Sequence, residues 1–121
     1  MTLKTIYKIF GGFHIFFGLV LISGLGPLPT DWAASVGVQT MAEHFGSAMM
    51  VIGYMFWMLP SWTSEDQLKT ATKPLIWVQF FLFLMQIYHV LNASIPADAS
   101  FWVQNVILIT FMVLFYRKSR A

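Results

Sequence analysis

The sequence contains no cysteine, and only 10% of its 121 residues are charged. A chain without cysteine forms no disulfide, no thiolate metal site and no cysteine nucleophile. Its few basic residues are not gathered in a patch with interleaved polar residues, so nucleic acid is not an expected partner. No Ser-His-Asp, zinc-protease or phosphate-loop motif is present. These absences favour a protein that is not an enzyme.

Apolar residues, by contrast, make up 58% of the chain. Soluble domains carry about 25% charged residues. A water-soluble domain of this size has too much surface for its volume to hide so many apolar side chains from water. Lipid is the simplest solvent that removes this difficulty, so the composition predicts an integral membrane protein.

The apolar residues form four stretches that are long enough to cross a membrane. A hydrocarbon core about 30 Å thick requires roughly 17–25 residues in a helix. The stretches cover residues 6–25, 41–59, 74–91 and 101–116, and Ala99 and Ser100 extend the last one. Pro60 ends the second stretch, and Pro74 suits the first turn of the third. The sequence therefore predicts an all-α protein, a single four-helix transmembrane bundle over residues 1–121.

The basic residues predict how these spans are oriented. All of them fall on one side of the four-span arrangement: Lys4, Lys8, Lys69, Lys73, Arg117, Lys118 and Arg120. Positively charged residues stay on the cytoplasmic side during insertion. We therefore expect both termini and the middle loop to be cytoplasmic, in a plasma membrane of bacterial type.

Tyrosine and tryptophan residues support the same orientation, because most of them fall near one of two levels. The inner level holds Tyr7, Trp57, Trp62, Trp77 and Tyr116, and the outer level holds Trp32, Tyr88 and Trp102. Amphipathic rings prefer the two membrane–water interfaces. A wrong number of spans would scatter these rings across the membrane.

The loop between the first and second spans is the longest segment outside the predicted membrane core. Thr30 or Asp31 can cap a short helix that runs from Trp32 to Val36. Gly37 then separates this helix from the second span. We expect Trp32 to anchor the short helix at the membrane surface.

Six polar residues share a similar depth near the outer ends of the second, third and fourth spans. They are Glu43, His44, Gln86, His89, Gln104 and Asn105. In the second span, spacings of 4, 3, 4 and 3 place one set on a common helix face: Glu43, Ser47, Met50, Tyr54 and Trp57. In the third span, Gln79 lies on one arc with Gln86 and His89. If these faces meet, Glu43 and His89 become near neighbours in a polar cluster.

This outer cluster allows three functional interpretations. The imidazoles of His44 and His89 with the Glu43 carboxylate can bind a divalent metal, or the two histidines can be axial ligands of a haem. A Glu–His pair can also move protons or hydrogen-bond the head group of a quinone. The alternative, which we favour, is that the cluster holds helices together and contacts lipid and water. No single span contains an HxxxH or HxxE pair, the spacings at which two side chains of one helix can bind the same metal. The metal site is therefore the least supported of the three interpretations.

His14 is a second candidate, because it lies about 10 Å above Tyr7 along the first span and so within the hydrocarbon region. Ionisable residues at such depth are costly and need a partner. Tyr54 and Gln79 lie in the same half of the membrane and can provide one. We favour a neutral His14 that is hydrogen-bonded between helices over one that contacts a ligand or carries protons.

Glycines mark where helices can approach closely. Gly11 and Gly18 share a face of the first span with His14, and Gly46 and Gly53 lie seven residues apart in the second. Small residues at such positions let two backbones come together in a membrane. We therefore expect a close helix crossing at these glycines.

The layout resembles the small four-helix membrane proteins of the DoxX-like family. The similarity rests on Ile9-Phe10-Gly11-Gly12 in the first span, Gly26-Pro27 in the outer loop and the pair Gly46 and Gly53. Members of that family have been proposed as accessory subunits of membrane oxidoreductases. The resemblance implies a protein partner or a quinone-linked role. It transfers no catalytic residue, because no catalytic motif can be matched.

These observations lead to one functional hypothesis and two alternatives. The first is an accessory or structural subunit of a membrane complex, surrounded by membrane lipids and associated with other subunits or with further copies of itself. The second is a protein that binds a quinone, a lipid or a haem near the outer face. The third is a small transporter that works as an oligomer, although no carboxylate lies at mid-depth for proton coupling.

Overall fold

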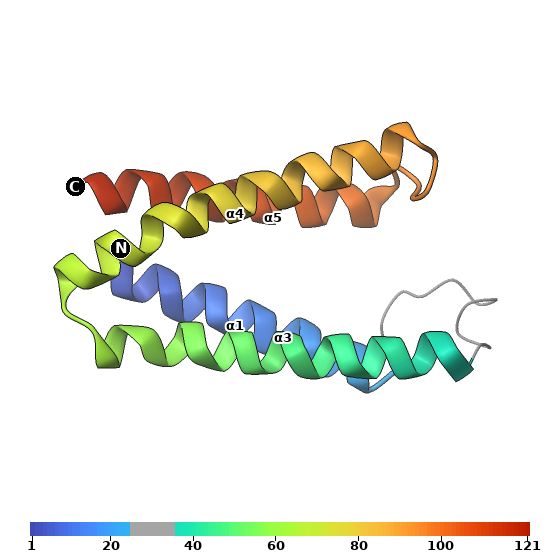
Figure 1. Cartoon of the computed structure of the whole chain (residues 1–121), viewed down its shortest axis with the longest axis horizontal. Helices are drawn as coiled ribbons and strands as arrows, with labels where there is room; N and C mark the ends of the chain where they lie inside the picture. Colours follow the sequence, from blue (N-terminus) through green and yellow to red (C-terminus); the bar gives the residue numbers. More distant parts are fainter. Residues whose placement is uncertain (25–35) are drawn as a thin grey trace. The chain divides into compact units, whose positions relative to one another are not determined.

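The computed structural model describes residues 1–24 and 36–121, and every regular element in these ranges is an α-helix (Figure 1). The helices are α1 (Leu3–Ile22), α3 (Val36–Trp62), α4 (Glu65–Leu91) and α5 (Ala99–Arg120). This confirms the predicted all-α class. The predicted short helix after Thr30, the Gly26-Pro27 loop and the expected end of the first span at Leu25 lie outside the described residues.

Three of these helices, α1, α4 and α5, are long and apolar enough to cross a membrane. They indicate membrane localisation, as the composition predicted. The helix α3 is not among them, because polar residues occupy its first half and Pro60 and Ser61 lie near its end. The membrane span predicted over residues 41–59, the second of four, therefore stays a prediction.

The structure corrects two helix boundaries that were predicted from prolines. Pro60 lies inside α3 and Pro74 lies inside α4, so neither residue marks a helix end. One proline removes a single backbone hydrogen bond, so a helix can continue through it. The start of α4 is set instead by hydrogen bonds between Ser64 and Gln67. The Ser64 side chain accepts from the Gln67 backbone N–H at 3.3 Å, and the Ser64 N–H donates to Gln67 Oε1 at 2.9 Å. This capping box starts the helix nine residues before Pro74.

Two other boundaries follow from local chemistry. The helix α1 ends at Ile22, and Gly24 has a φ of 71°, a left-handed conformation that glycine adopts readily. At the start of α5, the Asp98 side chain accepts from the Phe101 N–H at 3.0 Å. Because of this N-cap, Ala99 and Ser100 belong to α5, as predicted. The helix continues beyond Tyr116 to Arg120, so the basic tail is its last turn.

The described residues form two compact units. One unit is Tyr7–Trp62, which contains α3 and most of α1. The other combines Met1–Ile6 with Thr63–Ala121, which contains α4 and α5. Each unit has its own packing.

In the unit Tyr7–Trp62, α1 and α3 pack against each other through glycines. A Cβ atom on Gly11 would lie 2.5 Å from the carbonyl oxygen of Gly53, and one on Gly18 would lie 2.5 Å from that of Gly46. Both distances are shorter than real Cβ contacts, so the two backbones touch. As residue numbers rise along α1 they fall along α3, which makes the pair antiparallel (Figure 1). The predicted close crossing is confirmed.

In the other unit, α4 and α5 form an antiparallel helical hairpin (Figure 1). The residues they bury recur at helical spacing and mix apolar with polar side chains. On α4 they are Leu68, Thr72 and Gln79, and on α5 they are Phe101, Asn105, Phe111, Phe115 and Ser119. The hairpin therefore carries amide and hydroxyl groups among its buried residues.

Candidate functional site

The predicted outer cluster is divided between the two units. Glu43 and His44 lie on α3, whereas Gln86 and His89 lie on α4. Since each unit is described by itself, the proximity of Glu43 to His89 stays a prediction. Glu43 and His44 are both exposed.

Within the hairpin, the helix register brings part of the predicted cluster to one level. Lys73 of α4 and Ser119 of α5 line the same pocket. Fourteen residues further along α4 is position 87 (73 + 14), and fourteen residues back along α5 is position 105 (119 − 14). Both helices rise 1.5 Å per residue. Asn105 therefore lies at the level between Gln86 and His89, about 21 Å from the pocket.

Asn105 and Gln104 are adjacent in sequence but have different environments. Asn105 is 3% exposed, and its Nδ2 donates to the carbonyl oxygen of Phe101 at 2.8 Å. Its Oδ1 has no hydrogen-bond partner in the described residues. Gln104 is exposed, and its Nε2 lies 3.4 Å from the Ser100 hydroxyl. The buried hydrogen-bond acceptor at this level is therefore the Oδ1 atom of Asn105. Gln86 and His89 lie at the same level and are half-buried.

His14 and His44 share one local arrangement. The Nδ1 atom of His14 lies 2.9 Å from the Phe10 carbonyl oxygen, and that of His44 lies 2.7 Å from the Thr40 carbonyl oxygen. A carbonyl oxygen only accepts, so Nδ1 carries the proton in each ring. In the neutral imidazole, Nε2 then keeps its lone pair for a metal, a haem iron or a hydrogen-bond donor. Metal-binding histidines are commonly oriented in this way.

The surroundings of His14 are aromatic. Its ring centroid lies 4.4 Å from that of Phe10 and 5.8 Å from that of Phe56. Tyr54, one of its two expected partners, is 55% exposed and makes no hydrogen bond to it in the described unit. The bond that is present joins His14 to its own helix and not to another one. The other expected partner, Gln79, belongs to the second unit, so that pairing stays a prediction.

The charged and imidazole groups do not gather into a metal site in the part of the chain that the structure describes. No group of three His, Asp or Glu side chains there is arranged to hold a metal ion. The predicted ligand set of Glu43, His44 and His89 spans both units.

Gln79 is a buried residue that the sequence predicts as a partner for His14 and places on one arc with Gln86 and His89. It is 2% exposed, and neither Nε2 nor Oε1 has a hydrogen-bond partner among the described residues. It lies six residues, about 9 Å, beyond Lys73, within the apolar part of α4. Leaving such an amide unsatisfied costs about 1–3 kcal/mol. The sequence signal for a buried amide at this position is a glutamine inside an apolar stretch, on the same arc as Gln86.

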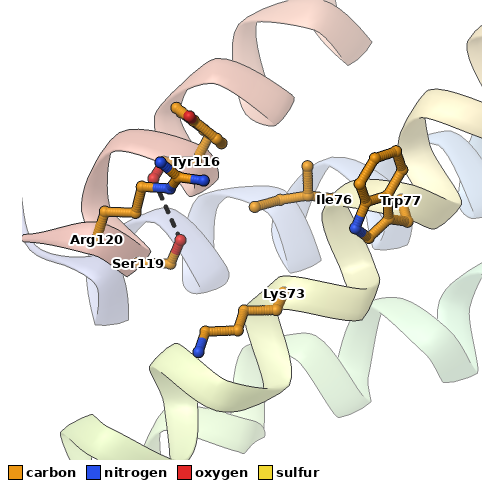
Figure 2. A pocket seen from close by; sticks show the side chains of 6 residues that line it. All are labelled: Lys73, Ile76, Trp77, Tyr116, Ser119 and Arg120. Carbon is orange, nitrogen blue, oxygen red and sulfur yellow. Dashed lines mark hydrogen bonds between the residues drawn. The ribbon is translucent and has the colours of Figure 1, made fainter.

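A pocket of about 240 Å³ lies at the other end of the hairpin (Figure 2). It is lined by Lys73, Ile76 and Trp77 of α4 and by Tyr116, Ser119 and Arg120 of α5. The sequence places the two basic and two aromatic residues at the inner membrane level but does not join them into a site. The lining residues of each helix lie three and four residues apart and therefore share a face. The antiparallel register, which the sequence does not give, brings these two faces together.

Comparisons with protein-family models, with curated proteins and with solved structures find no match for this chain.

Proposed function

We propose that this chain is an accessory or structural subunit of a membrane complex, which works by association and has no catalysis of its own. The observation that carries the proposal is an open polar face on α3. The predicted face contains Glu43, Ser47, Met50, Tyr54 and Trp57, and all of these except Met50 are exposed. From end to end it covers fourteen residues, about 21 Å of helix, in a hydrocarbon core about 30 Å thick.

Polar groups on this face need contacts that lipid tails do not provide. Met50 and Trp57 lie at the edge of this face beside Gly46 and Gly53 and contact α1. The open part of the face is therefore Glu43, Ser47 and Tyr54, which are exposed. The Ser47 hydroxyl donates to the Glu43 carbonyl at 2.8 Å, so its proton is satisfied within the helix. The Glu43 carboxylate and the Tyr54 hydroxyl extend from the same open face. Because ionisable groups are unfavourable in lipid, a helix of another subunit or of a second copy stabilises this face through polar contacts.

The proposal includes the membrane arrangement. We take α3 as the second of four spans, with both termini and the α3–α4 connection on the cytoplasmic side of a bacterial-type plasma membrane. The support is the distribution of basic residues at the ends of the spans. Membership of the DoxX-like family, and with it an association with a membrane oxidoreductase, is part of the same proposal.

Photo-crosslinking in native membranes tests the association. Since the chain lacks cysteine, single cysteines at Ser47 and Tyr54 can carry a benzophenone probe on the open face. A cysteine at Ile52 is the matched control, because Ile52 is exposed on the opposite side of α3. We expect a discrete heavier species from the S47C and Y54C variants and lipid adducts alone from I52C. Equal crosslinking from all three sites, a monomer that purifies without any partner, or unaided turnover of a substrate would contradict the proposal.

A small-molecule binder is the second candidate, and a specific observation favours it. The Oδ1 atom of Asn105 is buried without a partner among the described residues, at the level of Gln86 and His89 of the same unit. A haem, quinone or lipid head group near the outer face can use these side chains. A Soret band in the purified protein identifies haem, and mass spectrometry of an organic extract identifies quinone or lipid. A purified, active complex with neither would exclude this function.

A further inference from the structure

We propose that the pocket at the basic end of α4 and α5 binds the phosphate group of an anionic membrane lipid. The site lies about 21 Å along the hairpin from the level of Asn105. It does not depend on the association proposed for α3. Figure 2 shows three lining side chains from each helix.

Two side chains of the pocket supply hydrogen-bond donors for an anion. The Arg120 guanidinium carbon lies 4.2 Å from the centroid of the Tyr116 ring. The guanidinium lies over this ring and no carboxylate is among the described residues that line the pocket, so its N–H groups can form two parallel bonds to phosphate oxygens. The Lys73 ammonium adds three donors from the other helix. The Ser119 hydroxyl donates to the Tyr116 carbonyl at 3.2 Å, so we assign it no phosphate bond.

The balance of charge in the pocket favours an anion. The C-terminal end of α5 contributes about −0.5 charge through its free carbonyls. Lys73 and Arg120 contribute two full positive charges, so the local potential is positive. No carboxylate lies among the described lining residues. The acidic residues at the start of α4, Glu65 and Asp66, are seven or eight residues before Lys73, about 10–12 Å away, which is close to one Debye length.

The size and position of the pocket select a lipid head group. Its volume of about 240 Å³ is about eight times the ~30 Å³ that a water molecule occupies in the liquid. It is smaller than the roughly 300–1,000 Å³ of sites for drug-sized ligands, so it suits a phosphate ester and not a haem. Ile76 and Trp77 lie about one turn from Lys73 towards the apolar part of α4 and can contact the start of an acyl chain. Basic pockets between membrane helices on the cytoplasmic side bind phosphate head groups in this way.

Native mass spectrometry of the full chain in a mild detergent tests the assignment. The probes are phosphatidylglycerol and phosphatidylcholine with identical acyl chains, and inorganic phosphate. The test variant K73Q/R120Q removes both pocket charges, whereas K69Q/R117Q removes one charge from each helix outside the pocket. We expect phosphatidylglycerol to bind in preference to phosphatidylcholine. The pocket pair should weaken that binding roughly 30-fold, and the control pair less than about threefold.

Several results would overturn the proposal. Equal weakening by the two variant pairs would show that diffuse charge, and not the pocket, attracts the lipid. Equal binding of the two lipids would remove the role of the anion. Displacement of the lipid by an equal concentration of inorganic phosphate would make soluble phosphate the ligand. If the double variant does not fold, Arg120→Lys keeps the charge but loses the paired N–H edge, and an unchanged affinity for phosphatidylglycerol in that variant would also contradict the site.

Discussion

At the scale of single residues, polar side chains of the described helices form most of their hydrogen bonds with the backbone of their own helix. Hydroxyl groups of Thr40, Ser47, Thr72 and Thr110 each donate to the carbonyl four residues earlier. The Nδ1 atoms of the histidines His14 and His44 and the Nδ2 atom of Asn105 use the same carbonyl position. Such bonds satisfy a polar group within the helix that carries it, so apolar helices can contain these residues without an interhelical partner. Among the described residues, both amide atoms of Gln79 and the Oδ1 atom of Asn105 are buried without a partner.

Gln79→Leu tests whether that buried amide is only a burden on stability. Leucine has a similar size and removes two unsatisfied polar atoms, so we expect the variant to be more stable by about 1–3 kcal/mol. Unfolding of the purified protein in detergent, followed by circular dichroism, measures the change. Gln104→Leu is the control, because the same replacement at an exposed position should change stability by no more than about 0.5 kcal/mol. A less stable Gln79→Leu would mean that the amide has a partner in the membrane, such as a ligand or another helix.

At the scale of elements, the antiparallel pair α1 and α3 depends on glycines that face each other. The carbonyl oxygens of Gly11 and Gly53 lie where the other residue would carry a side chain. A Cβ atom on Gly53 would also lie 2.8 Å from the backbone nitrogen of Ile15 and 2.9 Å from the Cβ atom of His14. Backbone atoms cannot move aside as the end of a flexible side chain can. The close crossing therefore tolerates no substituent at these positions.

Gly53→Ala should consequently destabilise the unit, and Gly12→Ala should not. A Cβ atom on Gly12 would meet only the Trp57 ring at 3.4 Å, which is ordinary contact. Both substitutions gain about 1 kcal/mol of helix propensity, so the difference between the two variants isolates the steric effect. We expect that difference to be about 1–3 kcal/mol against Gly53→Ala, measured by unfolding in detergent. Equal stability of the two variants would show that α1 and α3 are not in backbone contact.

At the scale of the whole molecule, the basic residues lie at the ends of helices. Three of them, Arg117, Lys118 and Arg120, form the last turn of α5. Two others, Lys69 and Lys73, lie in the first half of α4. In the antiparallel hairpin these two groups are at the same end, where the pocket lies. That end is the one we assign to the cytoplasm.

Labelling with an impermeant maleimide on intact cells tests this orientation. Single cysteines at Thr2, Asp66 and Ala121 should be labelled only after lysis, because the proposed orientation puts all three on the cytoplasmic side. A cysteine at Ala97, in the exposed connection between α4 and α5, should be labelled without lysis. Labelling of Asp66→Cys on intact cells would rule out a cytoplasmic α3–α4 connection, and with it the four-span arrangement.

The sequence by itself determined that this protein is all-α and suited to a membrane. A chain with so few charges and such long apolar stretches can be stable as helices in lipid, because only a helix or a closed barrel satisfies its own backbone there. Glycine spacing also predicted a close helix crossing at Gly11 and Gly18 and at Gly46 and Gly53, since small residues let membrane helices approach closely. The structure shows that these two pairs face each other across α1 and α3. The boundaries predicted at Pro60 and Pro74 are wrong: α3 continues through Pro60 to Trp62, and the Ser64–Gln67 cap starts α4 nine residues before Pro74.

Only the tertiary structure decided which residues share a surface across two helices. Spacing along one helix defines its faces, but the register between helices depends on how side chains of both interlock. The pocket combines Lys73 and Trp77 with Tyr116 and Arg120, which are 39 or more positions away in sequence (116 − 77 = 39), and no pattern within either helix pairs them. Burial was decided in the same way: Asn105 and Gln104 are chemically alike and adjacent, and only packing against a second helix leaves one inside and the other exposed.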